Sequence, residues 1–185
     1  KRTYKCFKDD YIKRIFEGID LKNKPNIAWD AGNGVAGELM SEIAKKINTQ
    51  NFLLFENVDG NFPNHHPDPN SASNLNDLIE MVTSEKADIG LAFDGDGDRL
   101  GVVDNKGKVI WTDRLMMLFA QDVLARNPGA EIIYDVKCTR FLRDVITQAG
   151  GQPLMWKTGH SLIKAKLRES GAPLAGGRRG HIFFN

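Results

Sequence analysis

Short apolar runs alternate along the 185-residue chain with longer segments in which apolar residues recur at helical spacing. The clearest such segment carries Val35, Leu39, Ile43 and Ile47, which predict an amphipathic helix over 35–47. Alternation and turn residues predict strands at 26–29, 51–56, 88–93, 100–103, 109–111, 131–135, 152–156, 173–176 and 181–184. Apolar periodicity predicts further helices at 9–18, 74–85, 139–148 and 160–169, and one that starts at Thr112.

The order of these elements predicts the fold class. Two strand–helix series follow one another, and the second begins at Thr112, after a predicted hairpin. Strands joined through helices pair in parallel and bury both faces of their sheet. We therefore expect an α/β protein with two consecutive three-layer α-β-α domains and mixed, largely parallel sheets. The boundary between the domains falls near 104–110.

The run Asp94-Gly95-Asp96-Gly97-Asp98-Arg99, called the acidic loop below, is the strongest candidate for chemistry. Its carboxylates recur at every second residue, and the glycines let the backbone curl so that the three charges converge. Oxygen ligands of this kind suit a hard divalent cation such as magnesium, calcium or manganese. An EF-hand does not fit, because Arg99 and Asn105 stand where that loop requires glycine and glutamate. On composition alone, a solvated Asp/Gly turn is the alternative.

Residues 32–37, called the glycine turn below, read Gly-Asn-Gly-Val-Ala-Gly and match the fingerprint of dinucleotide-binding folds. They follow a predicted strand, and Glu56 lies near the offset usual for the acid that binds the ribose. Two observations count against a dinucleotide: Asp30 would place negative charge beside the pyrophosphate, and the acidic loop would have no task. The alternative is a turn whose glycines serve only chain geometry and helix–strand packing.

Net charge and cysteine positions indicate which partners and which cellular compartment to expect. Lys and Arg number 25 and Asp and Glu 24, a net charge of +1, so we expect no nucleic-acid or membrane partner. No apolar run reaches the roughly 18 residues of a membrane span, and no signal peptide is visible. Cys6 and Cys138 lie far apart without metal-ligand spacing, which favours a reduced, cytoplasmic protein.

Six motifs occur in a characteristic order. Besides the acidic loop they are Asp-Ala-Gly-Asn-Gly-Val-Ala-Gly at 30–37, Phe-Pro-Asn-His-His-Pro-Asp-Pro at 62–69, Asp-Val-Lys-Cys-Thr-Arg at 135–140, Trp-Lys-Thr-Gly-His-Ser at 156–161 and Gly-His-Ile-Phe-Phe at 180–184. With these motifs the chain resembles the α-D-phosphohexomutases, in particular their bacterial phosphomannomutase/phosphoglucomutase branch. The resemblance covers nearly the whole sequence.

The resemblance implies a domain assignment and a function. Residues 1–105 would be the family's second domain with the metal-binding loop, and 106–185 a truncated third domain ending in the sugar-binding loop. The implied enzyme uses Mg²⁺ and interconverts hexose 1-phosphate and 6-phosphate, of mannose or glucose, through a phosphoserine and a bisphosphorylated intermediate. The family's Thr-Ala-Ser-His-Asn-Pro motif, which carries the phosphoserine, does not occur in the chain. The implied partners are therefore a phosphosugar substrate and the missing flanking domains, and the chain alone is expected to be inactive.

The resemblance also implies roles for individual residues. The implied magnesium ligands are Asp94, Asp96 and Asp98, the implied catalytic residues are Arg99, Lys137 and His181, and the implied substrate-binding residues are Arg114, Lys137, Gly159, His160 and His181. The pattern itself supports two of them: Lys137 follows a strand at the usual active edge, and His160 starts a helix, where an anion is favoured. Each residue also has a non-functional alternative. Arg99 could form a surface ion pair, Arg114 could pair with Asp113 at a helix start, and Lys137 could be a solvated loop residue. His160 could be a capping or surface histidine, and His181 a partly buried one.

One stretch departs from the family pattern. Gly177-Arg178-Arg179 stands where the family usually has Glu-Met-Ser, whose Glu and Ser bind sugar hydroxyls. Either the sugar site is altered, or these three residues are foreign to the natural protein. For His65 and His66 we expect inter-domain hydrogen bonds. Two other functions stay open: a non-catalytic α/β module that binds a phosphosugar or a metal, and an NAD-binding domain.

Overall fold

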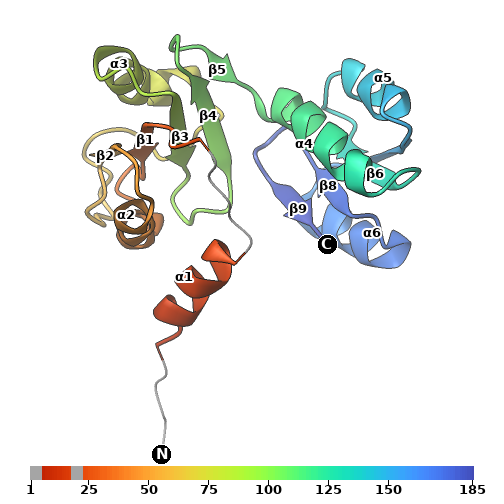
Figure 1. Ribbon diagram of the computed structural model, residues 1–185, viewed down its shortest axis with the longest axis horizontal. Coiled ribbons are helices and arrows are strands. Elements are labelled where there is room, and N and C mark those ends of the chain that lie inside the picture. Colours follow the sequence, from red (N-terminus) through yellow and green to blue (C-terminus); the bar gives the residue numbers. More distant parts are fainter. Residues whose placement is uncertain (1–5, 18–22) are drawn as a thin grey trace, which may run out of the picture. The chain divides into compact units, whose positions relative to one another are not determined.

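The structure, a computed structural model, describes residues 6–17 and 23–185. These residues form two units (Figure 1). The first unit comprises the described residues up to Asp68 together with Ser73–Gly97 and Val103–Lys108, and the second comprises Pro69–Ala72, Asp98–Val102 and Val109–Asn185. Within the described residues, no helix has the length and apolarity that a bilayer crossing requires.

Most predicted elements are present, with ends that differ by one or two residues. The helices are α1 (Lys8–Phe16), α2 (Ala36–Lys46), the 3₁₀ helix η1 (Ala72–Leu75), α3 (Asn76–Ser84), α4 (Thr112–Arg126), α5 (Phe141–Gln148) and α6 (His160–Ser170). The strands are β1 (Ile27–Asp30), β2 (Asn51–Leu54), β3 (Ile89–Phe93), β4 (Leu100–Asp104), β5 (Val109–Ile110), β6 (Glu131–Asp135), β7 (Gln152–Trp156), β8 (Leu174–Gly176) and β9 (Ile182–Phe184).

Two ends differ for a local reason. Strand β2 stops at Leu54, because Phe55 takes a positive φ of 52°, which no extended strand allows. Helix α5 begins only at Phe141, because the preceding N–H groups bind side chains: Lys137 N–H donates to Asp135 and Thr139 N–H to Asp113.

The first sheet has the strand order β2-β1-β3-β4-β5, in which β1 pairs in parallel with both β2 and β3. Ile27 and Trp29 on β1 pack with Met40 on α2. Gly90 on β3 lies against α3, since a Cβ placed there would meet Val82 at 2.7 Å. Successive strand residues point to opposite faces, so α2 and α3 form the outer layers of a three-layer unit.

The second sheet has the order β7-β6-β8-β9, with β6 parallel to β7 and β8, and β9 antiparallel at the edge. Ile132 and Tyr134 on β6 belong to a core with α4 and α5, whereas Ile133 between them belongs to a core with α6. This alternation again gives three layers and mixed sheets, and the predicted fold class is confirmed.

The topology places the loops that carry the motifs at the carboxyl edge of each sheet. In the first sheet Asp30, the last residue of β1, aligns with Ala92 of β3, so the glycine turn and the acidic loop leave neighbouring strands. In the second sheet, the motifs at 135–140 and 156–161 follow the neighbouring strands β6 and β7. This edge, where strand order reverses, is where ligands bind in open α/β sheets.

Candidate functional site

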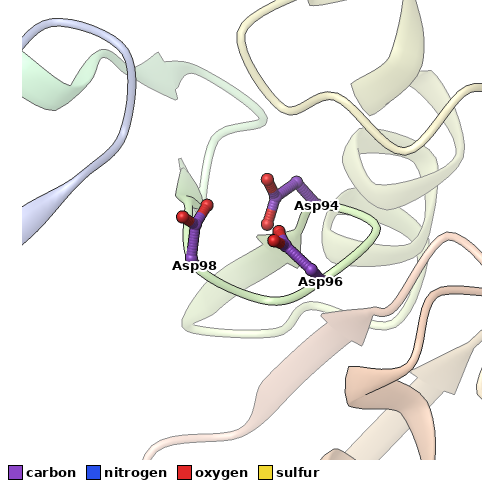
Figure 2. A group of neighbouring side chains, drawn as sticks. All are labelled: Asp94, Asp96 and Asp98. Carbon is purple, nitrogen blue, oxygen red and sulfur yellow. The ribbon is translucent and has the colours of Figure 1, made fainter. Parts of the chain in front are cut away.

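The acidic loop brings its three carboxylates together. One carboxylate oxygen from each of Asp94, Asp96 and Asp98 lies within 4.8 Å of the others, and Figure 2 shows Asp94 and Asp96 facing one another. Asp94 is buried, whereas the other two are exposed. Gly97 closes the loop with a φ of +74°, and its N–H donates to the Asp94 carbonyl oxygen at 3.1 Å. Sequence spacing predicted this convergence, and the geometry agrees with it.

The cluster fits a small hard cation. Oxygen ligands of Mg²⁺ lie about 2.1 Å from the ion, so two of them are separated by at most about 4.2 Å. The carboxylate oxygens here lie within 4.8 Å of one another, so a small rotation of the exposed Asp96 and Asp98 side chains would bring them to the distances that the ion requires. In the part of the chain that the structure describes, this is the one cluster of three or more His, Cys, Asp or Glu side chains whose ligand atoms lie close enough together to hold a metal ion. Three carboxylates without nitrogen or sulfur ligands favour Mg²⁺ or Mn²⁺ over zinc or copper.

The glycine turn supports the acidic loop. A Cβ placed on Gly34 would lie 2.8 Å from the carbonyl oxygen of Gly95, which is too close for any side chain. The N–H of Val35 donates to the same oxygen at 3.0 Å. On the other side, a Cβ on Gly97 would lie 3.0 Å from that of Ala36. The two loops therefore fit together only because both contain glycine.

The N–H groups of the glycine turn already bind protein oxygens. Asn33 N–H donates to Phe55 at 2.9 Å and Gly34 N–H to Ala31 at 2.8 Å. A Cβ on Gly37 would lie 2.0 Å from the carbonyl oxygen of Glu56, so this glycine lets α2 pack against the chain beyond β2. A pyrophosphate needs free N–H groups at such a turn. The geometry thus favours the structural role of the glycines over the dinucleotide one.

We expect Gly34→Ala to weaken manganese binding at the acidic loop at least tenfold, because the new methyl group displaces Gly95. Gly60→Ala is the matched control, since a Cβ there meets nothing within 4 Å. Manganese titrations followed by electron paramagnetic resonance measure both variants. Saturable stabilisation of the chain by NAD or NADP, lost in Gly34→Ala, would instead restore the dinucleotide function.

Asp30 and His65 form a buried pair beneath the glycine turn. The Asp30 carboxylate is fully buried and accepts hydrogen bonds from the Gly32 N–H at 2.8 Å and from His65 Nε2 at 3.0 Å. His65 Nδ1 lies 3.0 Å from the His66 carbonyl oxygen, so both ring nitrogens of a protonated His65 donate. The hydrogen bond to Asp30 is the main cause that raises the pKa of His65 from 6.5 to about 9.

This pair corrects two predictions. Inter-domain hydrogen bonds were expected for His65, but its partners Asp30 and His66 belong to the same unit. Asp30 was expected to repel a pyrophosphate at the glycine turn, but its carboxylate is buried and bound by Gly32 and His65. The cause lies in the chain between residues 57 and 70, which folds back over β1 and supplies the cation that a buried carboxylate needs.

At the edge of the second sheet, a pocket of about 130 Å³ collects three of the predicted substrate-binding residues. Its lining consists of Asp135, Thr158, Gly159, His160, Ile163, Gly177, Arg179 and His181; we call it the histidine pocket. The rings of His160 and His181 stack with centroids 5.5 Å apart. Asp135 and Thr158 had no predicted role here, although both belong to motifs that follow strand ends, whereas Arg179 belongs to the stretch expected to alter the sugar site.

The turn between β8 and β9 lies against the end of the acidic loop. His181 Nε2 lies 3.1 Å from Asp98 Oδ2. A Cβ on Gly180, which has a φ of +100°, would lie 2.9 Å from the Cβ of Arg99. Arg99 Nε is 3.9 Å from Asp98 Oδ1. The structure thus places two predicted catalytic residues, Arg99 and His181, beside one predicted metal ligand.

Lys137 and Arg114 lie apart from this group. Lys137 is exposed, and in the described structure the lining of the histidine pocket does not include it. The guanidinium of Arg114 lies 5.6 Å from the ring centroid of Phe141. The suggested Asp113–Arg114 ion pair is absent from the described residues; Asp113 accepts the Thr139 N–H at 3.0 Å instead. Substrate binding by Lys137 and Arg114 stays a prediction.

Comparison with known proteins identifies the family of both halves of the chain. The family described as phosphoglucomutase/phosphomannomutase, alpha/beta/alpha domain II, matches residues 9–107, and its domain III matches 111–185. A phosphomannomutase/phosphoglucomutase of Pseudomonas syringae is 56% identical over 176 residues, which cover 95% of this chain and 38% of the relative. A phosphoglucomutase of Neisseria gonorrhoeae is 52% identical over 98% of this chain and 40% of its own length.

A solved structure extends the comparison to three dimensions. The crystal structure of a phosphoglucomutase/phosphomannomutase family protein from Burkholderia thailandensis superimposes with a TM-score of 0.94 at 56% identity, covering 97% of this chain and 39% of that one. The chain therefore spans about two-fifths of the length of these relatives. From its matched domains and its identity to named mutases, the chain belongs to the phosphoglucomutase/phosphomannomutase family.

Proposed function

We propose that this chain is the metal- and sugar-binding part of a phosphohexomutase that interconverts hexose 1-phosphate and hexose 6-phosphate. The observation that carries the proposal is the convergence of the three carboxylates of the acidic loop, with His181 and Arg99 in contact with Asp98. The relatives named as mutases support it. We assign residues 1–105 to the metal-binding domain and 106–185 to the sugar-binding domain. The phosphosugar and the flanking domains of the relatives are the proposed partners.

The proposed roles follow from chemistry and position. Asp94, Asp96 and Asp98 would hold Mg²⁺, which when bound neutralises negative charge on a transferring phosphoryl group. Arg99 would donate hydrogen bonds to that phosphoryl group, since a guanidinium matches its oxygens.

The remaining roles concern the sugar and its protons. His181 would take or give a proton at a sugar hydroxyl, and its contact with Asp98 would orient the ring. Gly159 and His160 would bind the phosphosugar at the start of α6, and Lys137 and Arg114 would add positive charge. A phosphoserine and a bisphosphorylated intermediate belong to the same proposal. We also expect the protein in the cytoplasm, which suits its two separated cysteines.

A non-catalytic module is the second candidate, because the phosphoserine motif is absent from the 185 residues while a metal cluster and a pocket are present. Mutase activity separates the two. We expect the chain alone to convert no mannose 1-phosphate. The chain joined to the flanking domains of the Pseudomonas syringae relative, with the family's Glu-Met-Ser at 177–179, should turn it over at roughly 10 per second.

The joined protein is made with its own residues at 177–179 and with the family's Glu-Met-Ser there, so that the changed loop is tested separately from the metal site. Asp94→Asn, Asp96→Asn and Asp98→Asn together should lower turnover at least a hundredfold, because a bound metal contributes several kcal/mol to phosphoryl transfer. Turnover unaffected by this triple change would exclude the proposed metal chemistry.

A further inference from the structure

The histidine pocket carries an exposed arginine whose guanidinium forms no ion pair with the described residues. Arg179 lies in the turn between β8 and β9 and lines the pocket. Among the described residues, no carboxylate pairs with its guanidinium, whereas Arg14 and Arg126 both pair with neighbouring acids. An unpaired guanidinium in a pocket is a ready site for a planar or tetrahedral oxyanion.

The one acid of the pocket is already bound by the protein. Asp135 is 2% exposed, and its Oδ1 accepts the Lys137 N–H at 2.9 Å and lies 3.6 Å from the Cys138 thiol. Burial raises the pKa of that thiol to about 12, so it stays protonated and donates. Asp135 Oδ2 faces Gly177, where a Cβ would lie 2.4 Å away. The negative charge is therefore almost fully buried and already accepts hydrogen bonds from the protein.

Other lining groups add donors. The Thr158 hydroxyl is buried and has no hydrogen-bond partner among the described residues, which is uncommon for a buried polar group. The stacked rings of His160 and His181 line the same space, with His181 Nε2 3.1 Å from Asp98 Oδ2 and His160 Nε2 3.4 Å from the Ser161 hydroxyl. At about 130 Å³ the pocket is smaller than typical sites for whole ligands, so it suits one substituent of a larger molecule.

We propose that the histidine pocket binds an oxyanion, a carboxylate or a second phosphate, carried on the ring of the hexose phosphate. Arg179 supplies a planar fork of N–H donors, Thr158 adds its hydroxyl, and the two histidine rings form part of the wall. The preferred substrate is thus an acidic sugar phosphate, in contrast to the neutral hydroxyls that the family's Glu and Ser bind. The sugar-phosphate part of this inference rests on the proposed function.

Binding to the 185-residue chain tests the inference without any turnover. Inorganic phosphate, glucuronate and glucose are titrated at constant ionic strength, and the amide signals of Gly159, Gly177 and Gly180 are followed by NMR. We expect phosphate or glucuronate to bind saturably and at least tenfold more tightly than glucose. Stronger binding of phosphate identifies a second phosphate as the occupant, and stronger binding of glucuronate identifies a carboxylate.

Arg179→Ser should weaken that binding at least tenfold, whereas Arg178→Ser should change it less than twofold. Arg178 is the matched control, because it carries the same charge one residue away and does not line the pocket. Equal losses in both variants, glucose binding as tight as the anions, or no saturable binding would overturn the inference. Manganese titration of the same samples reports on the acidic loop independently, so failure of the metal site and failure of the anion pocket are distinguished.

Discussion

Replacement of His65 by alanine is expected to lower the free energy of unfolding of the first unit by about 3–5 kcal/mol. His65 is the cationic partner of a fully buried carboxylate, Asp30, with 3.0 Å between Nε2 and Oδ2. Removing one member of a buried ion pair leaves the other charge without compensation, which typically costs this much. The loss also frees the chain around residue 65 from β1, where it packs over Gly32.

Urea denaturation with Trp29 fluorescence measures this loss. Trp29 is the one tryptophan of the first unit, and Trp111→Phe with Trp156→Phe removes the signal of the second. His66→Ala is the control, because that side chain is exposed and should cost less than about 0.5 kcal/mol. Adding Asp30→Asn to His65→Ala should recover part of the loss. If the two histidine variants unfold alike, the buried pair contributes nothing.

The same pair predicts how stability depends on pH. The pKa of His65 is about 9 in the folded protein and 6.5 in the unfolded chain, so the folded state binds the proton more tightly. Its contribution is therefore complete below about pH 6.5 and is lost as the pH rises through 9. The side chain is 13% exposed, and we expect about 2–3 kcal/mol to be lost over this range. His65→Ala should lack this alkaline decline.

The fold was predictable from sequence because its elements carry strong periodicity. The helix over 35–47 and the strands at 131–135 and 152–156 each present apolar residues to a sheet or a helix layer at the spacing of their type. The ends were less predictable. The positive φ of Phe55 and the side-chain hydrogen bonds before α5 depend on contacts with distant residues, which a local pattern does not contain.

The candidate site was predictable where its chemistry is local. Alternate aspartates and glycines in the acidic loop were enough to predict three converging carboxylates. The pairing of Asp30 with His65 was not predictable, because it joins residues 35 apart through a loop without regular structure. The support of Gly95 by Gly34 and the unpaired Arg179 are likewise tertiary features. The glycine turn shows how one motif fits two functions until its N–H partners are known.

The second large effect concerns the acidic loop itself. Asp94→Asn, Asp96→Asn and Asp98→Asn together should reduce manganese affinity at least a hundredfold, because charged carboxylates supply nearly all the attraction for a hard cation. We expect the unchanged chain to bind manganese only weakly, since three carboxylates leave the rest of the coordination sphere of the ion to water. The three substitutions also remove mutual repulsion, so the fold should be no less stable.

A matched control removes the same charge elsewhere. Asp77→Asn, Glu80→Gln and Glu85→Gln change three exposed acids near α3 and leave the loop intact. This control separates a coordination site from general attraction between manganese and a more negative chain. It should bind manganese within twofold of the unchanged protein.

Manganese titration of these three proteins, followed by electron paramagnetic resonance, tests the central claim that the acidic loop is the metal site of a phosphohexomutase. The account predicts one saturable site in the unchanged chain and in the control, and its loss when Asp94, Asp96 and Asp98 become asparagine. Equal manganese binding by the unchanged chain and the triple-asparagine variant would contradict it.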